Sequence, residues 1–360
     1  MDDKIMSQYS IFFEALRIIK DNYLEPTDDE RLIRGAIKGM IESLGDEHSF
    51  YTPCTDKMLP GVPEHNENNA GIGISLLKID SNSLFVAEVF DDSSAKESGI
   101  CRFDTIFSID DKTVESMGYG ASVKALRGLQ GSIVNIGISK GDEVKVHKVV
   151  RKKIAKQRVF SSVLSQSNLG LARIIDFVED GADMLYSSVK KLVKQGVKGL
   201  IIDLRNNIGG YTHNLAKCLN LFMPEGLMFV SKGNDAREVE YYRADSNFFD
   251  IDIVILVNRF TASSAEIFAR LLAGAGRATI IGEPTTGKAT GQELFHLSDN
   301  TSINLSVSGT FCPNGVNLHK KIMPDILMDC EPCILSGRYA YYALSIEKDP
   351  YIAKSLDCLG

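Results

Sequence analysis

The sequence lacks an excess of positive charge, and it lacks an apolar stretch long enough to cross a membrane. Its 40 Lys and Arg residues are outnumbered by 47 Asp and Glu residues, which gives a formal net charge of -7 at pH 7. Because binding to phosphates is driven mainly by clustered Lys and Arg, this balance argues against a nucleic acid or an anionic membrane as partner. No segment reaches the roughly 18 consecutive apolar residues of a membrane span.

The sequence also lacks the cysteine spacing of a disulfide framework or of a complete zinc site. Its seven cysteines are an odd number at scattered positions, namely 54, 101, 218, 312, 330, 333 and 358. Cys330 and Cys333 form one C-x-x-C pair, but no second pair of Cys or His ligands accompanies it. We therefore read the cysteines as reduced thiols and expect neither a metal nor another cofactor.

The N-terminus lacks the basic segment and apolar run of a secretory signal peptide. Met1-Asp-Asp-Lys-Ile5 opens acidic, so as written the chain is expected to be cytoplasmic, or to belong to the cell envelope or periplasm if an export signal was trimmed. Apolar residues at helical spacing predict a helix over 9–24, and Thr27 with Glu30 forms a capping box before a second helix. These helices fall in a predicted N-terminal region over 1–68, and residues 52–70 are predicted to be a linker to the next domain. Their apolar stripes make a candidate homodimer surface.

A β-rich segment over 69–153 follows. Alternating and β-branched runs predict strands at 71–77, 84–89, 105–109 and 133–138, with short helices at 94–98 and 119–126. This segment resembles a PDZ domain of the kind found in proteases. The resemblance implies that Gly71, Ile72, Gly73 and Ile74 form a loop whose amides bind a peptide C-terminus. A plain β-barrel or sandwich with a Gly-rich hairpin is the alternative.

Strands and helices alternate in the predicted core over 154–330, which a C-terminal segment over 331–360 follows. Predicted strands at 171–175, 199–205, 253–257 and 278–281 are separated by predicted helices at 181–194, 212–222 and 264–273. Apolar strands that alternate with helices indicate a mostly parallel α/β sheet covered on both faces. Sites in such sheets lie beyond the carboxyl ends of the strands, where the 205–210 segment and Ser263 are expected.

Lys288 belongs to a segment that is compatible with two different chemistries. Gly282 to Lys288 follows a predicted strand and has the spacing of a phosphate-binding loop. The next residue is Ala289, however, whereas a nucleotide-binding loop needs a Ser or Thr hydroxyl there to hold Mg²⁺. The sequence therefore argues against an NTPase.

Ser263 and Lys288 together offer a nucleophile and a base. A serine hydroxyl needs a base to remove its proton, and a lysine can do so only when burial lowers its pKa from about 10.4. Few charges flank Lys288, and Gln292 is placed to orient its amine without adding a charge.

The oxyanion of an acyl transfer needs N–H donors. The amide of Ser264, which follows the nucleophile, and those of Gly209 and Gly210 are candidates. Two alternatives stay open: Ser263 could be only a helix N-cap, since Ser263-x-x-Glu266 fits a capping box, and Ser264 could be the nucleophile.

Taken together, these residues resemble the carboxyl-terminal processing peptidases, also called tail-specific proteases. The resemblance extends over nearly the whole chain and rests on five further motifs: Gly45–Tyr51, Leu126–Gly131, Leu204–Gly210, Gly287–Gln292 and Met323–Ile326. It implies that Ser263 is the nucleophile, Lys288 the base and Gln292 its orienting residue. Ile208, Gly274 and Ala289 depart from the usual pattern of the family.

The resemblance implies an α/β core of ClpP/crotonase type with an inserted PDZ-like domain and helical N- and C-terminal segments. It also implies a metal-free serine endopeptidase that cleaves protein or peptide substrates near accessible C-termini, with the PDZ domain recognising their tails. A catalytically silent PDZ-containing peptide-binding scaffold is the alternative.

Overall fold

The computed structural model describes residues 3–52, 70–77, 83–90, 92–140, 143–153, 157–164, 167–235, 238–328 and 349–359. The chain divides into two compact units. The first comprises residues 1–64 together with 291–308, and the second comprises residues 65–290 together with 309–360. The predicted linker over 52–70 and the pair Cys330 and Cys333 fall almost wholly outside the described residues. The domain boundaries drawn from the sequence stay a prediction.

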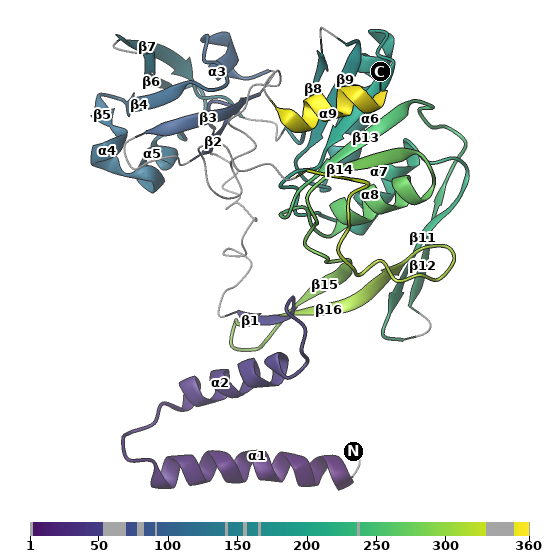
Figure 1. The fold of residues 1–360 in the computed structure, drawn as a ribbon. Coiled ribbons are helices and arrows are strands. Elements are labelled where there is room, and N and C mark those ends of the chain that lie inside the picture. The colour runs from purple at the N-terminus through teal and green to yellow at the C-terminus, as the bar shows by residue number, and fades with distance from the viewer. Residues whose placement is uncertain are drawn as a thin grey trace. The chain divides into compact units, whose positions relative to one another are not determined.

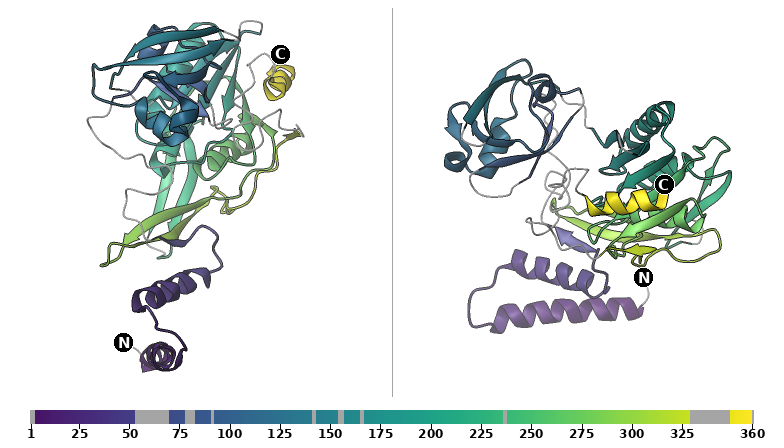
Figure 2. Two further views of the ribbon diagram at one scale, coloured as in Figure 1. Left: turned by 90° about the vertical axis from the view of Figure 1, so that its left-hand side faces the viewer. Right: turned by 45° about the horizontal axis from the view of Figure 1, so that its top comes forward.

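Two antiparallel helices open the first unit. Helix α1 (Asp3–Asn22) and helix α2 (Asp29–Glu42) lie side by side, in purple, in all views of Figures 1 and 2. The predicted cap at Thr27 is wrong, because the N-cap of α2 is Asp28, whose carboxylate accepts from the amides of Glu30 and Arg31. An ionised carboxylate is a stronger acceptor than a hydroxyl and also favours the positive end of the helix dipole.

Much of the apolar surface of the two helices is exposed within this unit. The exposed large apolar side chains include Tyr9, Ile11, Phe12, Phe13, Ile18, Ile19, Tyr23, Ile33 and Met40. Exposed apolar side chains in this number are more than scattered surface residues usually provide.

A small antiparallel sheet completes the first unit. Strand β1 (Phe50–Thr52) pairs with β16 (Ser302–Phe311), and β15 (Thr290–His296) pairs with the other side of β16. Phe50 lies opposite Asn304 although they are far apart in sequence. None of these three strands was predicted, since their residues are mostly half-buried and show no strong period.

The second unit begins with an antiparallel β domain that has its own core. Its strand order is β2-β3-β4-β6-β7, with β5 paired to β4. All four predicted strands and both helices are confirmed within a few residues, while β5, β7 and α4 were not predicted. The elements are β2 (Ile74–Leu77), β3 (Leu84–Val89), α3 (Ser94–Glu97), β4 (Thr105–Ile109), β5 (Lys112–Thr113), α4 (Val114–Met117), α5 (Tyr119–Ala125), β6 (Ile133–Lys140) and β7 (Glu143–Val150).

The α/β core of the second unit contains the sheet that positions the site. Its strand order is β17-β14-β13-β10-β9-β8, and every pair is parallel except β8 with β9. The strands are β8 (Val159–Leu164), β9 (Leu169–Ile174), β10 (Gly199–Asp203), β13 (Asp252–Val257), β14 (Ala278–Gly282) and β17 (Ile326–Leu327). The prediction of a mostly parallel sheet is confirmed.

Helices cover both faces of this sheet. Leu200 and Ile202 of β10 belong to the apolar core shared with α6 (Gly181–Lys194), α7 (Thr212–Asn220) and α8 (Ser264–Gly274). Ile201, between them, faces the other way and packs with Tyr351 of α9 (Pro350–Leu359), drawn in yellow in Figure 1. Because side chains alternate along a strand, a β10 that is apolar throughout fills both layers.

A hairpin outside the core sheet was not predicted. It consists of β11 (Gly226–Gly233) and β12 (Val239–Ala244), with Phe229 stacked on Tyr242. Within the described part of the chain, none of the helices combines the length and the apolar character needed to cross a membrane.

Candidate active site

Two loops from neighbouring strands meet at the carboxyl edge of the core sheet. One loop runs from Leu204 to Gly210 after β10, and the other runs from Asn258 to Ser263 after β13. Asn258 joins them, since its side chain accepts from the Asn206 amide at 3.0 Å and donates to the Asn206 side chain at 3.1 Å. Asn258 is fully buried, so these bonds replace contacts with water and hold the loops together.

A second asparagine ties three segments to one another. The Asn207 side chain donates to the Ile174 carbonyl at 2.9 Å and accepts from the Gly209 amide at 2.8 Å. Its main-chain carbonyl accepts from the Ala262 amide at 2.9 Å. The end of β9, the loop after β10 and the loop before α8 are therefore fixed together by one residue that sequence reasoning gave no role.

Ser263 occupies a strained position between β13 and α8. Its φ of 57° and ψ of -127° are uncommon for a residue with a side chain and cost on the order of 1–3 kcal/mol. Ser263 is the N-cap of α8, which was the alternative role that its sequence suggested. In the capping box, however, the well-formed bond runs from its amide to the Glu266 carboxylate, and its hydroxyl makes no capping bond of ordinary geometry.

Glu266 links the serine segment to the lysine segment. One carboxylate oxygen accepts from the Ser263 amide at 3.0 Å and from the Lys288 amide at 2.8 Å. The other accepts from the Gly287 amide at 2.7 Å and from the Thr285 hydroxyl. The amides of Ser263 and Lys288 thus contact the same oxygen atom, which brings the two candidate catalytic residues to one place.

The environment of Glu266 shifts its ionisation. Its side chain is almost fully buried, and this burial raises the pKa of Glu266 above its usual value, while the four donors oppose the shift. The spacing Ser263-x-x-Glu266 was the available signal for this residue, but it indicated only a cap.

A side-chain hydrogen bond links Ser264, the residue after the candidate nucleophile, to Gly210. The Ser264 hydroxyl is buried and donates to the Gly210 carbonyl at 2.9 Å. Among the described residues, neither the Ser264 amide nor the Gly210 amide has an intramolecular acceptor. Both amides are therefore candidate donors, and the Ser264 amide lies at the positive end of α8, next to Gly209.

Gly209 departs from its expected role as an N–H donor. Its amide is already bound by the Asn207 side chain, so it is not available to an oxyanion. Gly209 is instead required sterically: its φ is 99°, and a Cβ there would lie 2.6 Å from the Ser263 Cβ. An Asn side chain often binds the amide two residues on, so the spacing Asn207-x-Gly209 could have revealed this bond.

The segment around Lys288 is held by bonds that involve its main chain and the Thr285 hydroxyl. Thr285 donates its amide to the Ile322 carbonyl and accepts from the Ile322 amide, and the Ala289 amide donates to His319 Nδ1 at 3.1 Å. The chain then enters β15 rather than a helix. A phosphate-binding loop would need a helix N-terminus at this point, so the geometry agrees with the exclusion of an NTPase.

Gln292 lies on β15 in the first unit. Its side-chain nitrogen donates to the His48 carbonyl, as does the side chain of Asn304 at 3.1 Å. This bond fixes the orientation of the Gln292 amide and leaves its oxygen as the acceptor for other donors.

A buried ionic network lies directly beneath the loop after β10. Asp203 accepts from Arg205 and Arg173; Arg205 also pairs with Asp349, and Arg173 pairs with Glu88 of β3. Burial alone would raise the pKa of Asp203, but the two guanidinium groups outweigh it and hold that pKa well below its usual value. Asp203 therefore stays ionised at neutral pH, and its bonds to Arg205 anchor the start of the loop.

The predicted peptide-binding loop of the β domain is held mainly by main-chain bonds. Gly71 exchanges two hydrogen bonds with Lys152, so its amide is engaged, contrary to expectation. The carbonyls of Ile72 and Gly73 accept from Ala95 and Phe90. Within the described residues, the amides of Ile72 and Gly73 have no acceptor, whereas Ile74 has already entered β2.

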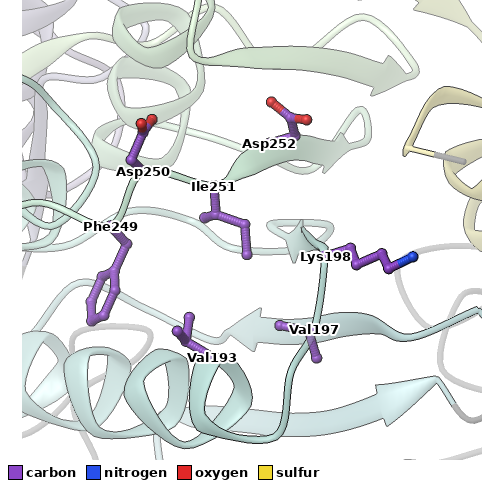
Figure 3. Close-up of a pocket in the computed structure, with 7 residues that line it drawn as sticks. All are labelled: Val193, Val197, Lys198, Phe249, Asp250, Ile251 and Asp252. Atoms are coloured by element: carbon purple, nitrogen blue, oxygen red, sulfur yellow. The ribbon is translucent and has the colours of Figure 1, made fainter.

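A cavity of about 350 Å³ lies elsewhere in the core (Figure 3). Its lining comes from the end of α6 and from the start of β13, at the amino ends of the strands: Val193, Val197, Lys198, Phe249, Asp250, Ile251 and Asp252. Its lining includes no serine, threonine or cysteine, and it lies at the strand ends opposite to those of the Ser263 loop. The described residues also contain no group of His, Cys, Asp and Glu side chains arranged to hold a metal.

Comparisons with protein families cover three segments of the chain. Residues 168–328 match peptidase family S41, residues 63–139 match the PDZ domain, and residues 2–54 match the N-terminal domain of the activating protease CtpB. The PDZ prediction is thereby confirmed.

Known proteins resemble most of the chain. The carboxy-terminal processing protease CtpA of Bacillus subtilis is 31% identical over 324 residues, which are 89% of this chain and 69% of that protein. A probable CtpA-like serine protease of Staphylococcus haemolyticus is 29% identical, over 86% of this chain and 63% of that protein. The chain therefore spans about two thirds of the length of these relatives.

Solved structures share the fold. A putative S41 protease from Bacteroides fragilis has a TM-score of 0.61 at 16% identity. The match covers 94% of this chain and 91% of the Bacteroides chain. The photosystem II D1 C-terminal processing protease has a TM-score of 0.51 at 24% identity, over 92% of this chain and 91% of its own. With these matches in sequence and fold, the chain belongs to the carboxyl-terminal processing peptidases, which are serine-type peptidases of family S41 with a PDZ domain.

Proposed function

We propose that Ser263 is the nucleophile of this peptidase and Lys288 its general base. The observation that carries the proposal is the shared contact of both amides with one oxygen of Glu266. The choice of Ser263 over Ser264 is supported by the buried Ser264 hydroxyl, which already donates to the Gly210 carbonyl. The Ser263 hydroxyl, which is half-buried and makes no capping bond of ordinary geometry, is the better candidate to attack a substrate.

The reaction is an acyl transfer in two steps. Ser263 Oγ attacks the carbonyl carbon of the scissile bond, and neutral Lys288 accepts the hydroxyl proton and delivers it to the leaving amine. A water molecule then attacks the acyl-enzyme; Lys288 takes its proton and returns it to Ser263 as the acid product leaves. Gln292 orients the amine through its side-chain oxygen, since its nitrogen is bound to His48.

The oxyanion donors in this proposal are the amides of Ser264 and Gly210. Both are without an intramolecular acceptor among the described residues, and the two residues are linked by the bond from the Ser264 hydroxyl to the Gly210 carbonyl. The removal of one oxyanion donor typically costs about 10²–10³ in kcat, so two fixed donors contribute a large share of the rate. Gly209 shapes the site instead of donating to it.

The PDZ loop recognises the free C-terminus of the substrate. The unoccupied amides of Ile72 and Gly73 support a carboxylate at this place, while Gly71 and Ile74 serve the geometry of the loop. Substrates are therefore proteins or peptides with accessible C-termini that are cleaved near that end.

Two further features belong to the same proposal. The core is of the ClpP/crotonase type, supported by its parallel sheet with helices on both faces. The chain forms a homodimer through α1 and α2, supported by the exposed apolar side chains that this helix pair cannot bury alone.

The test is proteolysis of an unfolded protein substrate by three variants. Ser263→Ala and Lys288→Ala should each lower kcat by about 10³-fold or more, as for other nucleophile and base deletions. The control, Ser264→Ala, keeps the adjacent amide and should retain cleavage. Cleavage that survives both Ser263→Ala and Lys288→Ala would contradict the dyad.

A further inference from the structure

Arg158 is a buried cation that the proposed reaction does not use. It lies just before β8, and its side chain is only 8% exposed. Its Nη1 atom donates to both carboxylate oxygens of Asp176 at 2.6 Å, and its Nη2 atom donates to a carboxylate oxygen of Glu179 at 3.2 Å. Its main-chain carbonyl accepts from the Ile175 amide at 2.8 Å. One arginine thus fastens the segment 175–179, which follows β9, at three points.

Phe177, inside this segment, binds the main chain on both sides of Gly210. The Phe177 amide donates to the Gly209 carbonyl at 3.0 Å, and the Phe177 carbonyl accepts from the Tyr211 amide at 2.8 Å. This is a parallel β-bridge between Phe177 and Gly210, in which Gly210 directs its own N–H and C=O groups away from Phe177. The Gly210 carbonyl accordingly accepts from the Ser264 hydroxyl at 2.9 Å. The bridge therefore turns the Gly210 amide toward the same side.

The Phe177 side chain also supports the second proposed oxyanion donor. Its ring is fully buried and packs on Phe268 of α8, with 5.5 Å between the ring centroids. Helix α8 begins at Ser264, whose amide is that donor. At Gly210 the approach is closer still, since a Cβ there would lie 2.4 Å from the Phe177 carbonyl oxygen. Phe177 thus contacts both the chain at Gly210 and the helix that presents the Ser264 amide.

We propose that Arg158, through the segment 175–179, positions the oxyanion donors of the active site. Its ion pairs fix that segment, and Phe177 links the segment to the Gly210 amide and to α8. Arg158 and Phe177 are positioning residues, because they act on the donors and not on the substrate. The inference rests on the role that the proposed function gives to the Gly210 and Ser264 amides.

Loss of the Arg158 side chain should weaken binding of the transition state and spare binding of the substrate. The oxyanion forms only when Ser263 attacks, so a displaced donor costs energy in the transition state and not in the ground state. A displacement of about 1 Å can lower the rate by up to about 10²-fold. Because the main-chain bonds of Phe177 remain, we expect a loss of kcat of about tenfold at unchanged KM.

The experiment compares Arg158→Ala with Arg277→Ala in the full chain. Arg277 is the matched control: it also pairs with an aspartate, Asp250, and binds main-chain carbonyls, but it lies at the amino ends of the core strands. Both substitutions should lower the unfolding temperature. Only Arg158→Ala should lower kcat on an unfolded protein substrate, by about tenfold, and neither should change KM.

A peptide aldehyde that ends at the mapped cleavage site gives a second measurement. Ser263 Oγ adds to the aldehyde carbon, the carbonyl double bond becomes a C–O⁻ group at the oxyanion donors, and the serine proton passes to Lys288. This adduct resembles the tetrahedral intermediate, so its inhibition constant depends directly on the donors. The inhibition constant should rise by about tenfold in Arg158→Ala and stay unchanged in Arg277→Ala.

A milder variant, Asp176→Asn, takes the place of Arg158→Ala if that protein does not fold. It keeps the shape of the side chain and one acceptor oxygen but removes the charge that strengthens the bonds to Arg158. Because charge-assisted bonds are roughly twice as strong as neutral ones, kcat should fall and the aldehyde inhibition constant should rise by about threefold each.

The outcomes separate this inference from the proposed function. Parental kcat and parental aldehyde inhibition in Arg158→Ala, or in Asp176→Asn where it takes its place, would overturn the positioning role and leave the proposed dyad intact. A fall in kcat without weaker aldehyde inhibition would overturn it too, because the loss would then lie outside the oxyanion donors. Cleavage by Ser263→Ala at the parental rate would contradict the proposed function itself, and this inference would fall with it.

Discussion

The loops around Ser263 and the PDZ loop at Gly71–Ile74 both expose main-chain amides beside glycines, yet they are fixed by different means. Buried side chains lock the loops at Ser263: Asn207, Asn258 and Glu266 bind main-chain groups of neighbouring segments. The PDZ loop is held by main-chain bonds to Lys152, Phe90 and Ala95.

The difference matches what each loop has to do. An oxyanion hole gains from donors that are fixed before the charge develops, and buried side-chain bonds provide that rigidity. A peptide-binding loop must accept many different C-terminal sequences. The PDZ loop is held by main-chain bonds, and it offers main-chain amides that any C-terminal carboxylate can bind. We therefore expect damage at the first loops to affect kcat and damage at the PDZ loop to affect KM.

The largest effect is expected for Glu266→Ala. This change leaves four donors without an acceptor and releases the Ser263 segment from the Lys288 segment, so kcat should fall by at least about 10²-fold. The measurement is kcat on a protein substrate. The control variant is Glu293→Ala, which removes an exposed glutamate of β15. A kcat of Glu266→Ala within twofold of the parent value would contradict the idea that buried side-chain bonds fix the loops at Ser263 for catalysis.

A smaller loss is expected for Gly209→Ala, judged against Gly196→Ala. Both glycines have positive φ, 99° and 82°, but only at position 209 would the new Cβ collide with Ser263 and the Ser264 amide. Both variants should lose about 1–3 kcal/mol of unfolding free energy from backbone strain. Only Gly209→Ala should also lose kcat, by about 10²-fold.

Thermal unfolding with activity assays separates the two effects. Equal kcat values for Gly209→Ala and Gly196→Ala would mean that the approach of Gly209 to Ser263 has no catalytic consequence.

A change of KM rather than kcat is expected for Gly73→Ala. A Cβ at Gly73 would lie 2.3 Å from the Ser93 Cβ and displace the PDZ loop, whereas one at Gly99, of similar φ in the same domain, would meet nothing closer than 4.0 Å. Gly73→Ala should raise KM by about tenfold for a substrate with a free C-terminus, the loss of about 1.4 kcal/mol of binding. The Gly99→Ala control should not.

Substrates with an amidated C-terminus sharpen this test. They should bind the parent and Gly73→Ala equally weakly. A fall in kcat at constant KM would show that the PDZ loop contributes to catalysis in the way the Ser263 loops do.

The smallest effect is a displacement of the acidic limb of activity. Because burial raises the pKa of Glu266, lowering the pH should protonate it at a higher pH than an ordinary glutamate and remove the acceptor of the Ser263 and Lys288 amides. The profile of kcat/KM against pH should thus contain a step on the acid side at a higher pH than an ordinary glutamate would give. In Glu266→Gln the step that belongs to Glu266 should be absent, whereas the fall caused by protonation of Lys288 should remain; an unchanged profile would assign the whole limb to another group.

The sequence was sufficient for the core elements with strong local periods. Helix α6 was predicted with its observed bounds, and β10, β13 and α8 were found within about two residues because buried strands and amphipathic helices differ in local pattern. Strands β15, β16, β11 and β12 were missed. Their pairing depends on partners distant in sequence, as for Phe50 with Asn304, and no local pattern encodes it.

The same distinction applies to the site. Ser263, Lys288 and Gln292 could be proposed from spacing and resemblance, because reactive side chains are few and recognisable. The roles of Asn207, Asn258 and Glu266 could not, since each binds main-chain atoms whose positions depend on the fold. Gly209 is an example. Its flexible backbone was predicted from the sequence, but the bond from its amide to the Asn207 side chain was not.

The most direct test of the account is covalent labelling with a serine-reactive fluorophosphonate, followed by peptide mass spectrometry. The account predicts one added phosphonate, located on Ser263, that disappears in Lys288→Ala and Ser263→Ala and persists in Ser264→Ala. Labelling at Ser264, or labelling of Ser263 that is unaffected by Lys288→Ala, would contradict it.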